Sequence, residues 1–420
     1  MKLIETIETF ISGDWGNESH TEDTPCEVFC VRGADIEPIK NQDYNHIPKR
    51  YISKRSYENK LLQVGDIIVE KSGGSPTQST GRVCLITPNL IEKLQSVDCS
   101  NFCAAFRVKK EWDAEYIYLY IQHFYNMGAF FNFEGKTSGI KNLQLEQAYQ
   151  AIEIKPISIA EQKKLAKTIR TIDGKTAINR SINQNLEAMA KQLYDYWFVQ
   201  FDFPNEEGKP YKSSGGEMVW NDKLKRNIPV GWHCGNLFEI AGFTNGLACQ
   251  KFRPKDDEVP LPVIKIREMH DGISVDTEKV TSNIPESVKV YNGDVLFSWS
   301  ASLEVMLWAY GLGGLNQHIF KVTSANDFPK SFYYFQLLDY VDVFKKMAEA
   351  RKTTMGHITQ DHLQQSTIAI PDNKDVADKF EELISPIFEL IVKLQEEISN
   401  LTKQRDELLP LLMNGQIIIE

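Results

Sequence analysis

Apolar residues recur at alternating steps of four and three through the middle of the chain, residues 159–203. The seam runs through Leu165, Ile169, Ile172, Thr176, Asn179, Asn183, Leu186, Ala190, Leu193 and Trp197. This alternation is typical of a helix that packs along its length against another helix. At about 1.5 Å per residue it forms a rod of roughly 60 Å, so burial of its stripe needs a partner of similar length.

The same stepping recurs near the end of the chain, which supplies such a partner. The second seam runs through Val376, Phe380, Leu383, Ile387, Leu390, Leu394, Glu397, Leu401, Gln404, Leu408 and Leu411. Phe380, Leu401 and Leu408 each lie 215 positions after a residue of the first seam. The residues predicted to pack the helix pair are Leu165, Ile172, Leu186, Leu193, Phe380, Leu394, Leu401 and Leu408.

A large block with short β-like runs precedes each helix, and the second block repeats the first. Gly293-Asp294-Val295 echoes Gly65-Asp66-Ile67, and the run 263–267 echoes the run 28–32. The loops at 71–77 and 298–304 differ in sequence. Two binding domains that read different things would produce this pattern, as would neutral drift after duplication. The first interpretation is favoured because the helices stayed in register while the loops did not. Within the first block, residues 116–131 are predicted to be helical and residues 151–154 to form a strand.

Composition places the chain among ordinary globular proteins, with 42% hydrophobic and 25% charged residues in 420. No apolar run reaches the roughly 18 residues of a membrane span, and the start does not read as a signal peptide. The odd count of seven cysteines indicates reduced thiols and a cytoplasmic protein. The net charge of −10 argues mildly against nucleic-acid binding unless basic patches or partner subunits compensate.

Candidate chemistry is confined to scattered basic, small and aromatic side chains in the loops. As contacts to phosphates and base edges we select Arg32, Lys49, Arg50, Lys71, Ser72, Gly73, Gly74, Arg82, Arg107 and Lys136 in the first block and Arg253, Lys265, Arg267, Trp299 and Lys321 in the second. For each one alone, a solvated surface residue is the competing interpretation.

Enzymatic and metal motifs fail on inspection. Gly135-Lys136-Thr137 lacks the earlier glycine of a phosphate-binding loop, since Phe130 stands there. Cys26 and Cys30 are separated by three residues, as are Cys99 and Cys103, whereas zinc knuckles prefer two. No nucleophile–base constellation is present. We therefore expect neither catalysis nor a metal in this chain.

The run 193–204, Leu-Tyr-Asp-Tyr-Trp-Phe-Val-Gln-Phe-Asp-Phe-Pro, together with the helix start at Glu161-Gln162, Asn316-Gln317-His318 and the run 408–415, resembles the specificity subunits of type I restriction–modification systems. The resemblance covers essentially the whole chain, in the family's order. It implies a mixed α/β fold with a pseudo-twofold internal repeat. Two globular target-recognition domains, residues 1–155 and 232–371, are separated by two long antiparallel helices, residues 156–203 and 372–413. Residues 204–231 are expected to be a linker, and the tail 414–420 is expected to end in a short strand that pairs with a sheet edge of the first block.

The resemblance also implies a function and partners. Each domain would read one half of a bipartite double-stranded DNA target, and the helices would dock two methyltransferase subunits. Those subunits would hold S-adenosylmethionine and the catalytic site. Restriction subunits with ATP-driven translocation would join the complex, and Mg would be bound in the partner subunits. This chain would bind no cofactor, contact no membrane and catalyse no reaction. The alternative from the residues alone is an elongated coiled-coil adaptor with two protein-binding heads.

Overall fold

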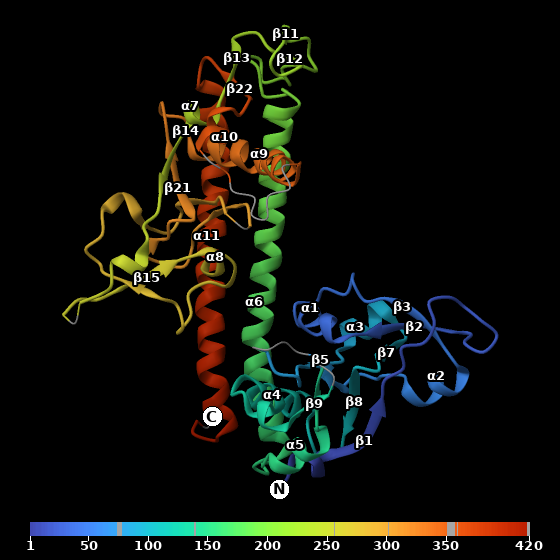
Figure 1. The fold of residues 1–420 in the computed structure, drawn as a ribbon. Coiled ribbons are helices and arrows are strands. Elements are labelled where there is room, and N and C mark those ends of the chain that lie inside the picture. Colours follow the sequence, from blue (N-terminus) through green and yellow to red (C-terminus); the bar gives the residue numbers. More distant parts are fainter. Residues whose placement is uncertain are drawn as a thin grey trace. The chain divides into compact units, whose positions relative to one another are not determined.

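A computed structural model describes residues 1–73, 78–137, 140–255, 257–300, 302–350, 358 and 360–417. The chain divides into two compact units: Met1–Ala177 with Leu401–Glu420, and Ile178–Asn400. We call them the first and the second unit. Two long helices, α6 (Ile159–Tyr194) and α11 (Asp375–Met413), contribute to both and run side by side (Figure 1). Among the described residues, no helix combines the length and the apolarity that crossing a membrane requires.

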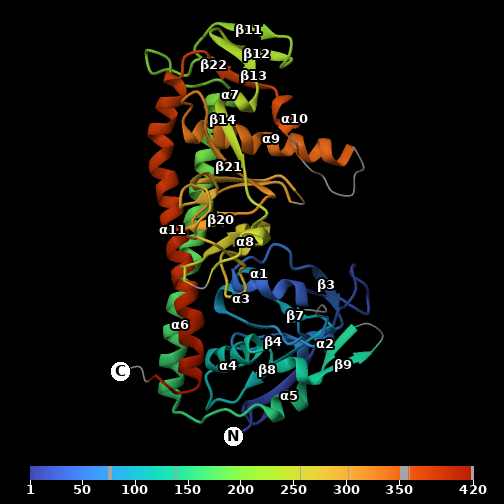
Figure 2. The ribbon, with the colours of Figure 1, turned by 60° about the vertical axis from the view of Figure 1, so that its left-hand side comes forward.

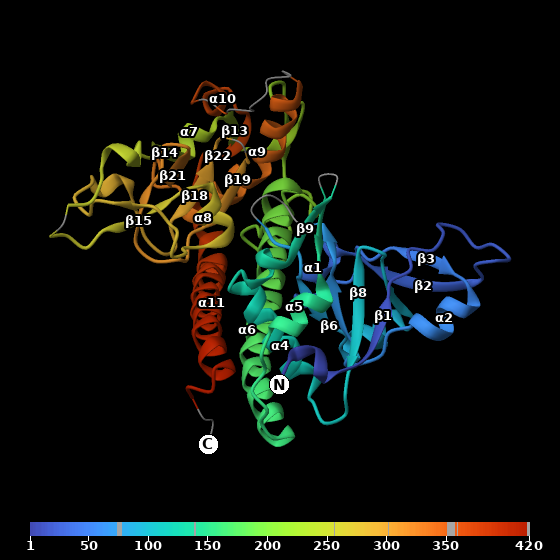
Figure 3. The ribbon, with the colours of Figure 1, turned by 60° about the horizontal axis from the view of Figure 1, so that its bottom comes forward.

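The first unit is built on a four-stranded antiparallel sheet in the order β1-β8-β4-β6 (Figure 3). Its elements are η1 (Leu3–Thr6), β1 (Ile7–Ser12), β2 (Cys26–Val31), η2 (Gly33–Asp35), α1 (Ile36–Lys40), β3 (Lys49–Ile52), α2 (Lys54–Lys60), β4 (Ile67–Glu70), β5 (Ser72–Gly73), β6 (Val83–Leu85), α3 (Pro88–Leu94), β7 (Val97–Cys99), β8 (Cys103–Val108), α4 (Ala114–Asn126), η3 (Ala129–Phe133), β9 (Glu134–Thr137), β10 (Ile140–Leu143) and α5 (Leu145–Ala151). Two small sheets, β3-β2-β7 and β5-β10-β9, accompany it.

Both faces of this sheet are buried, because side chains alternate along each strand. Ile67 and Val69 of β4 face a core that includes α4, α5 and parts of α6 and α11, whereas Ile68 faces a second core under β2 and β7. On β8, Phe106 and Ala105 divide in the same way. A strand buried on both faces has a continuous apolar run, and Ile67-Ile68-Val69 is such a run.

The second unit repeats this plan in the sheet β14-β21-β18-β19, against which α9 packs (Figure 2). Its elements are a π-helical turn (Asp195–Val199), β11 (Met218–Asn221), β12 (Arg226–Pro229), β13 (Trp232–Gly235), α7 (Leu237–Ile240), β14 (Ala241–Asn245), η5 (Cys249–Lys251), β15 (Leu261–Ile264), α8 (Ile266–Asp271), β16 (Lys279–Val280), η6 (Glu286–Val288), β17 (Lys289–Val290), β18 (Val295–Ser298), β19 (Glu304–Leu307), β20 (Gly313–Leu315), β21 (Ile319–Ser324), α9 (Lys330–Ala350), α10 (Gln360–Gln364) and β22 (Ile368–Pro371). Val295 and Leu296 again face opposite cores.

The internal repeat extends to the strand register. Ile67 pairs with Phe106 in the first unit, as Val295 pairs with Val322 in the second. The lateral sheets repeat as well, with β2 parallel to β7 and β15 parallel to β20. The predicted mixed α/β fold with a pseudo-twofold repeat is therefore confirmed.

One detail of the predicted repeat is wrong. Ser100 donates its N–H to Val31 O, and Asn316 donates its N–H to Ile264 O. Val31 therefore corresponds to Ile264, whereas the match of 28–32 with 263–267 would equate it with Ile266. The error is a slip of two residues, and a two-residue slip preserves the alternation of faces, so an apolar pattern alone does not detect it.

The long helices pair antiparallel within each unit. In the second unit Asn179 Nδ2 donates to Glu397 Oε2 (2.9 Å), and Asn183 Nδ2 donates to Ile391 O (3.3 Å). In the first unit Arg405 lies 3.3 Å from Asp173. Residue numbers on α11 fall as those on α6 rise, which defines the direction. The two asparagines are only 5% and 6% exposed, so they make specific polar contacts at the seam where leucine would pack in any register.

The predicted packing residues are buried to different degrees. Phe380 is fully buried and Leu165 is 9% exposed, whereas the remaining six are half-buried: Ile172, Leu186, Leu193, Leu394, Leu401 and Leu408. Leu383 and Leu390, placed on the second seam from the sequence, are 50% and 41% exposed, so that placement is wrong. The buried face of α11 instead runs through Ala377, Phe380, Ile384, Phe388 and Ile391.

Three local predictions have different outcomes. The helix expected over 116–131 is confirmed as α4 and η3, separated at Gly128, whose φ is +71°. The strand expected at 151–154 is wrong, because α5 continues to Ala151 and only Glu153 bridges to Lys2. The region 204–231, expected to be a linker, holds the hairpin β11–β12. Residues 418–420, where a pairing strand was expected, lie outside the described part of the chain.

Candidate nucleic-acid interface

Two of the selected cations neutralise an aspartate at equivalent places in the two units: Asp66, which is buried, and Asp294, whose side chain is 25% exposed. Asp66 accepts the Gln63 N–H (2.8 Å) and both Nε and Nη2 of Arg107 (2.8 Å each). Asp294 accepts the Tyr291 N–H (2.8 Å) and lies 2.7 Å from Lys321 Nζ. The Asp66 side chain is 1% exposed, and a buried carboxylate is stable as an anion only when it is paired. The recurring Gly-Asp dipeptide is therefore a structural device.

A second buried acid recurs after the strand β2 or β15. Asp35 accepts two hydrogen bonds from the Arg32 guanidinium, at 2.8 and 2.9 Å. Glu268 occupies the corresponding place and accepts from Arg267 at 2.6 and 3.0 Å. The acid side chains are 2% and 1% exposed. Hydrogen bonding to these carboxylates raises the pKa of Arg32 and Arg267 above the ordinary value, which keeps both guanidinium groups charged and committed to the fold.

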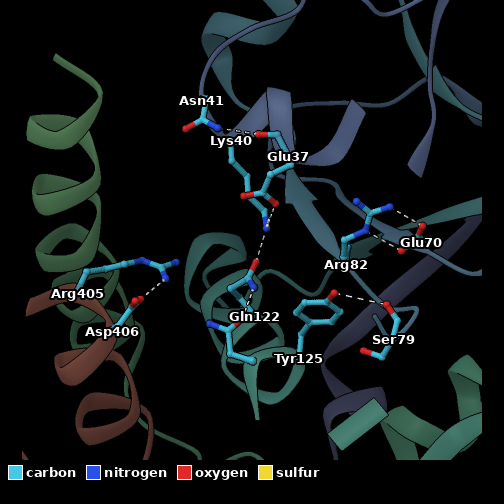
Figure 4. Close-up of polar contacts among 11 residues, drawn as sticks. Glu37, Lys40, Asn41, Glu70, Ser79, Arg82, Gln122, Tyr125, Arg405 and Asp406 are labelled. Carbon is cyan, nitrogen blue, oxygen red and sulfur yellow. Dashed lines mark hydrogen bonds and ion pairs between the residues drawn. The ribbon is translucent and has the colours of Figure 1, made fainter. Parts of the chain in front are cut away.

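Arg82 forms a third pair, with Glu70 at the end of β4 (Figure 4). Its Nη2 and Nε lie 2.7 and 2.9 Å from the Glu70 carboxylate, whose side chain is 4% exposed. Gly73 adjoins the same carboxylate: a Cβ there would lie 2.9 Å from Glu70 Oε1, and its φ is +138°. Arg82 and Gly73 thus have structural reasons to be what they are.

Figure 4 also shows polar contacts that connect α4 to its neighbours in the first unit. Lys40 Nζ donates to Gln122 Oε1 at 2.7 Å, and the Tyr125 hydroxyl donates to Ser79 O at 3.4 Å. The C-terminal turn of α11 packs on the same core through Leu409 and Leu412. The Leu409 and Leu412 contacts hold the last turn of α11 on the first unit, and none of the contacts in this group uses a selected residue.

The remaining selected cations differ in exposure: the side chain of Lys49 is 57% exposed, whereas that of Arg50 is 11% exposed. Lys49 pairs with Glu27 at 2.9 Å, and Arg50 pairs with Glu18 at 3.0 Å while lying 3.9 Å over the Trp15 ring. The exposed Lys49–Glu27 pair contributes little to stability, and its two charges exchange readily with other ions.

In the second unit Lys265 pairs with Glu278, and Arg253 is exposed. Gly74 and the side chain of Lys136 lie outside the described residues; the Lys136 backbone pairs with Lys141 between β9 and β10.

Lys71 and Ser72 lie beside an open groove in the first unit. Their N–H groups both donate to Phe102 O, at 2.8 and 3.0 Å. The groove has a volume of about 510 Å³ and is lined by Ser12, Lys71 and the polar side chains of α5, among others. Among the described residues, Lys71 makes no ion pair within 4.0 Å. Its ammonium group is therefore available to a ligand in this groove.

Trp299 lies at the corresponding edge of the second unit. It is half-buried, its Nε1 donates to Asn245 Oδ1 at 3.3 Å, and its ring lies 5.6 Å from that of His318. Asn245 and His318 are not among the residues selected from the sequence: Asn245 stands in no recognisable motif, and His318 lies in the run 316–318, which carries the family resemblance without indicating a role for the side chain. What marks these two residues is their place beside Trp299, which only the strand register reveals.

The cysteines serve as core residues. Cys30, Cys84, Cys99 and Cys103 are buried, and burial raises the pKa of the Cys103 thiol to about 11. Throughout the described part of the chain, no group of three or more His, Cys, Asp or Glu side chains is arranged to hold a metal ion.

Two α/β units on one repeated plan, each joined to a shared pair of long helices, define a duplicated recognition subunit. The family model "Type I restriction modification DNA specificity domain" matches residues 35–188 and 229–400. Because the match covers most of the chain and occurs once in each half, the chain belongs to this family of specificity subunits.

Individual relatives are similar but distant. The MjaIX specificity subunit of Methanocaldococcus jannaschii is 25% identical over 278 residues, covering 64% of this chain and 61% of that protein. The HindI specificity subunit of Haemophilus influenzae is 23% identical over 313 residues, covering 61% of this chain and 67% of that protein. The chain thus matches about three fifths of the length of the first relative.

Among solved structures, the type I restriction–modification S subunit from M. genitalium has a similar fold. Its TM-score is 0.58 at 14% identity, covering 98% of this chain and 95% of that one. This likeness supports the architecture alone.

Proposed function

We propose that the chain is the DNA-recognition subunit of a type I restriction–modification complex, with one unit reading each half of a bipartite target. The observation that supports this best is the strand register: the two units repeat the same hydrogen-bonded sheet, and each half matches the specificity-domain model. A duplicated frame with unlike edges suits two different half-sites. B-DNA presents equivalent groove faces about 34–36 Å apart, and the helix pair sets the separation of the two readers.

The helices also dock two methyltransferase subunits. On α6, Ile178, Ile182 and Met189 are 62%, 39% and 50% exposed, although they flank a buried seam. On α11, Leu383 and Leu390 are exposed as well. Clustered exposed apolar side chains on a soluble helix are typical of protein interfaces. Those subunits would hold S-adenosylmethionine and the catalytic site, and restriction subunits would supply ATP-dependent, Mg-dependent chemistry, leaving this chain non-catalytic.

Part of the grip on phosphates comes from these partners. The chain carries a net charge of −10, and Arg32, Arg82, Arg107 and Arg267 are held by buried carboxylates. The isolated chain is therefore expected to bind its target weakly, with a shallow dependence on salt. Full affinity with a steep salt dependence for the chain alone would contradict this division of roles.

Lengthening the helix pair tests the proposed ruler. A seven-residue insertion in both α6 and α11, at matched positions, preserves the seam and adds about 10.5 Å. At about 3.4 Å per base pair, the unread spacer should grow by about three base pairs while both half-sites stay the same. Sequencing of methylated sites in a host that expresses the complete complex gives the answer.

A matched insertion in the linker, between Glu206 and Glu207, serves as the control and should leave the spacer unchanged. Exchange of residues 1–155 for another reader should change one half-site only. Altered half-sites with a constant spacer would refute the ruler. No methylation at any specific site, together with stable binding of other proteins, would favour the coiled-coil adaptor.

A further inference from the structure

One edge of each unit has the same backbone hydrogen bonds. Lys71 donates its N–H to Phe102 O (2.8 Å) and accepts at its carbonyl from the Leu143 N–H (2.8 Å). Trp299 donates its N–H to His318 O (3.3 Å) and accepts from the Ile358 N–H (3.0 Å). Lys71 therefore corresponds to Trp299, and Phe102 corresponds to His318.

A third pair of positions completes the correspondence. Ser12 ends β1 opposite Ala104, and Asn245 ends β14 opposite Phe320, the matching residue of β21. The glycine that follows each lies against the backbone of the strand connection: a Cβ would meet a carbonyl oxygen at 2.0 Å after Ser12 and at 2.2 Å after Asn245. Backbone this close fixes both edges in the same conformation.

The side chains at these three positions differ completely between the units. The first unit presents the Lys71 ammonium group, the Phe102 ring, which is 56% exposed, and the Ser12 hydroxyl beside the groove of about 510 Å³. The second unit presents an indole, an imidazole and an amide. The two units share the same backbone hydrogen bonds at this edge but carry different side chains there. Such a combination indicates a position where specificity is set.

In the second unit the three groups are already ordered. The Trp299 Nε1–H donates to one lone pair of Asn245 Oδ1, and this hydrogen bond orients the amide. The second lone pair of Oδ1 and the amide hydrogens can then bind a ligand. Asn245 is exposed. The His318 ring lies against Trp299, with its Nε2 3.2 Å from Gln317 Nε2. Its Nδ1 is buried and makes no hydrogen bond to any residue that the structure describes.

We propose that these equivalent positions are the base-reading positions: Asn245, oriented by Trp299 and His318, in the second unit, and Lys71 with Ser12 and Phe102 in the first. This inference rests on the proposed function. An amide that donates and accepts side by side matches N7 and N6 of adenine, and an ammonium group matches O6 and N7 of guanine. The second unit therefore reads an A·T pair through Asn245, and the first reads a G·C pair through Lys71.

The test is Asn245→Asp in the complete complex, with methylated sites sequenced in a host. Asp accepts but does not donate, so it prefers the cytosine amino group. At one position of one half-site, the preference for A·T over C·G should fall by about 10- to 100-fold, as expected for loss of one bidentate contact. Trp299→Phe retains a ring but releases the amide, and should relax the same position. Asn227→Asp, on the exposed side of β12, is the matched control and should change nothing.

Lys71→Gln should change the other half-site alone, in the direction from G·C to A·T. An unchanged half-site in both Asn245→Asp and Trp299→Phe, with wild-type sites methylated normally, would overturn the inference and leave the proposed function intact. Absence of any specific site for the wild-type complex would overturn both. Since the unaffected half-site is read in the same molecules, it reports that each variant is folded and assembled.

Discussion

Truncation of Phe380 to alanine should destabilise the second unit far more than the same change at Leu383, three residues further along α11. Both positions lie within the first ten residues of α11. Phe380 is fully buried, whereas Leu383 is 50% exposed. The apolar stepping of the sequence placed both on the seam, so the comparison separates that pattern from the observed packing.

The magnitude follows from the surroundings of the Phe380 ring. Its centroid lies 5.0 Å from that of Phe198, 5.5 Å from Trp197, 6.1 Å from Phe335 and 6.2 Å from Tyr194. Removal of a buried Phe costs about 3–5 kcal/mol, and four rigid aromatic neighbours hinder collapse of the cavity. We expect the upper half of that range for Phe380→Ala. For Leu383→Ala we expect less than about 1 kcal/mol, because half of its side chain is already in water.

Guanidinium unfolding, followed by tryptophan fluorescence and by far-UV circular dichroism, measures the difference. Trp197 adjoins Phe380, so the fluorescence transition reports the affected core directly. For a unit of roughly 200 residues, each kcal/mol lowers the melting temperature by about 2–4 °C. An equal or larger loss in Leu383→Ala than in Phe380→Ala would refute the observed seam and restore the one expected from the sequence.

Two further predictions concern buried acids. Arg107→Met leaves Asp66 buried without its cation. It should lower the free energy of unfolding by about 1–3 kcal/mol, less than for a fully buried pair, because Arg107 is 34% exposed. Lys49→Met, at an exposed pair, should leave the urea midpoint unchanged, and equal losses of unfolding free energy in the two variants would contradict the reasoning. Burial raises the pKa of Asp98 to about 7, against about 3.9 in an unfolded chain. The folded state therefore keeps a proton that the unfolded state releases, so this contribution to stability is complete below about pH 4 and is lost as the pH rises to about 7. Asp98→Asn should lose less unfolding free energy between pH 5 and pH 8 than the wild type, and identical pH profiles would count against the assignment.

The long helices and the repeated blocks were predictable because each leaves a periodic trace. A four-three alternation identified α6 and α11, and two-faced apolar strands such as Ile67–Glu70 stood out against their turns. The phase of the seam on α11 was less accessible. Leucines at 383 and 390 continue the pattern, yet Ile384 and Ile391 are the buried residues. Where apolar residues stand next to each other, periodicity does not decide which of them faces the partner helix.

The candidate interface was harder to predict, since charge in a sequence carries no information about pairing. Four of the selected arginines lie against carboxylates whose side chains are 4% exposed or less. Some of these acids are distant from their arginine along the sequence, and the others are close to it but stand in no distinguishing motif. Asn245 and His318 show the opposite case: they were not selected from the sequence, yet the structure makes them part of the candidate interface. Only the strand register places these two polar residues beside Trp299.

The acids that pair with cations in both units also bear on how a chain with net charge −10 would serve a DNA-binding complex. Each unit has the same two acid positions, filled by Asp35 and Asp66 in the first unit and by Glu268 and Asp294 in the second. A guanidinium group that neutralises such an acid does not move to a phosphate without exposing the fold to the cost of an unpaired buried charge. The same basic residue therefore cannot both stabilise the fold by pairing with an acid and offer its positive charge to a phosphate. Proteins resolve such competition by placing the charge elsewhere, and the proposed methyltransferase partners are the natural place for it.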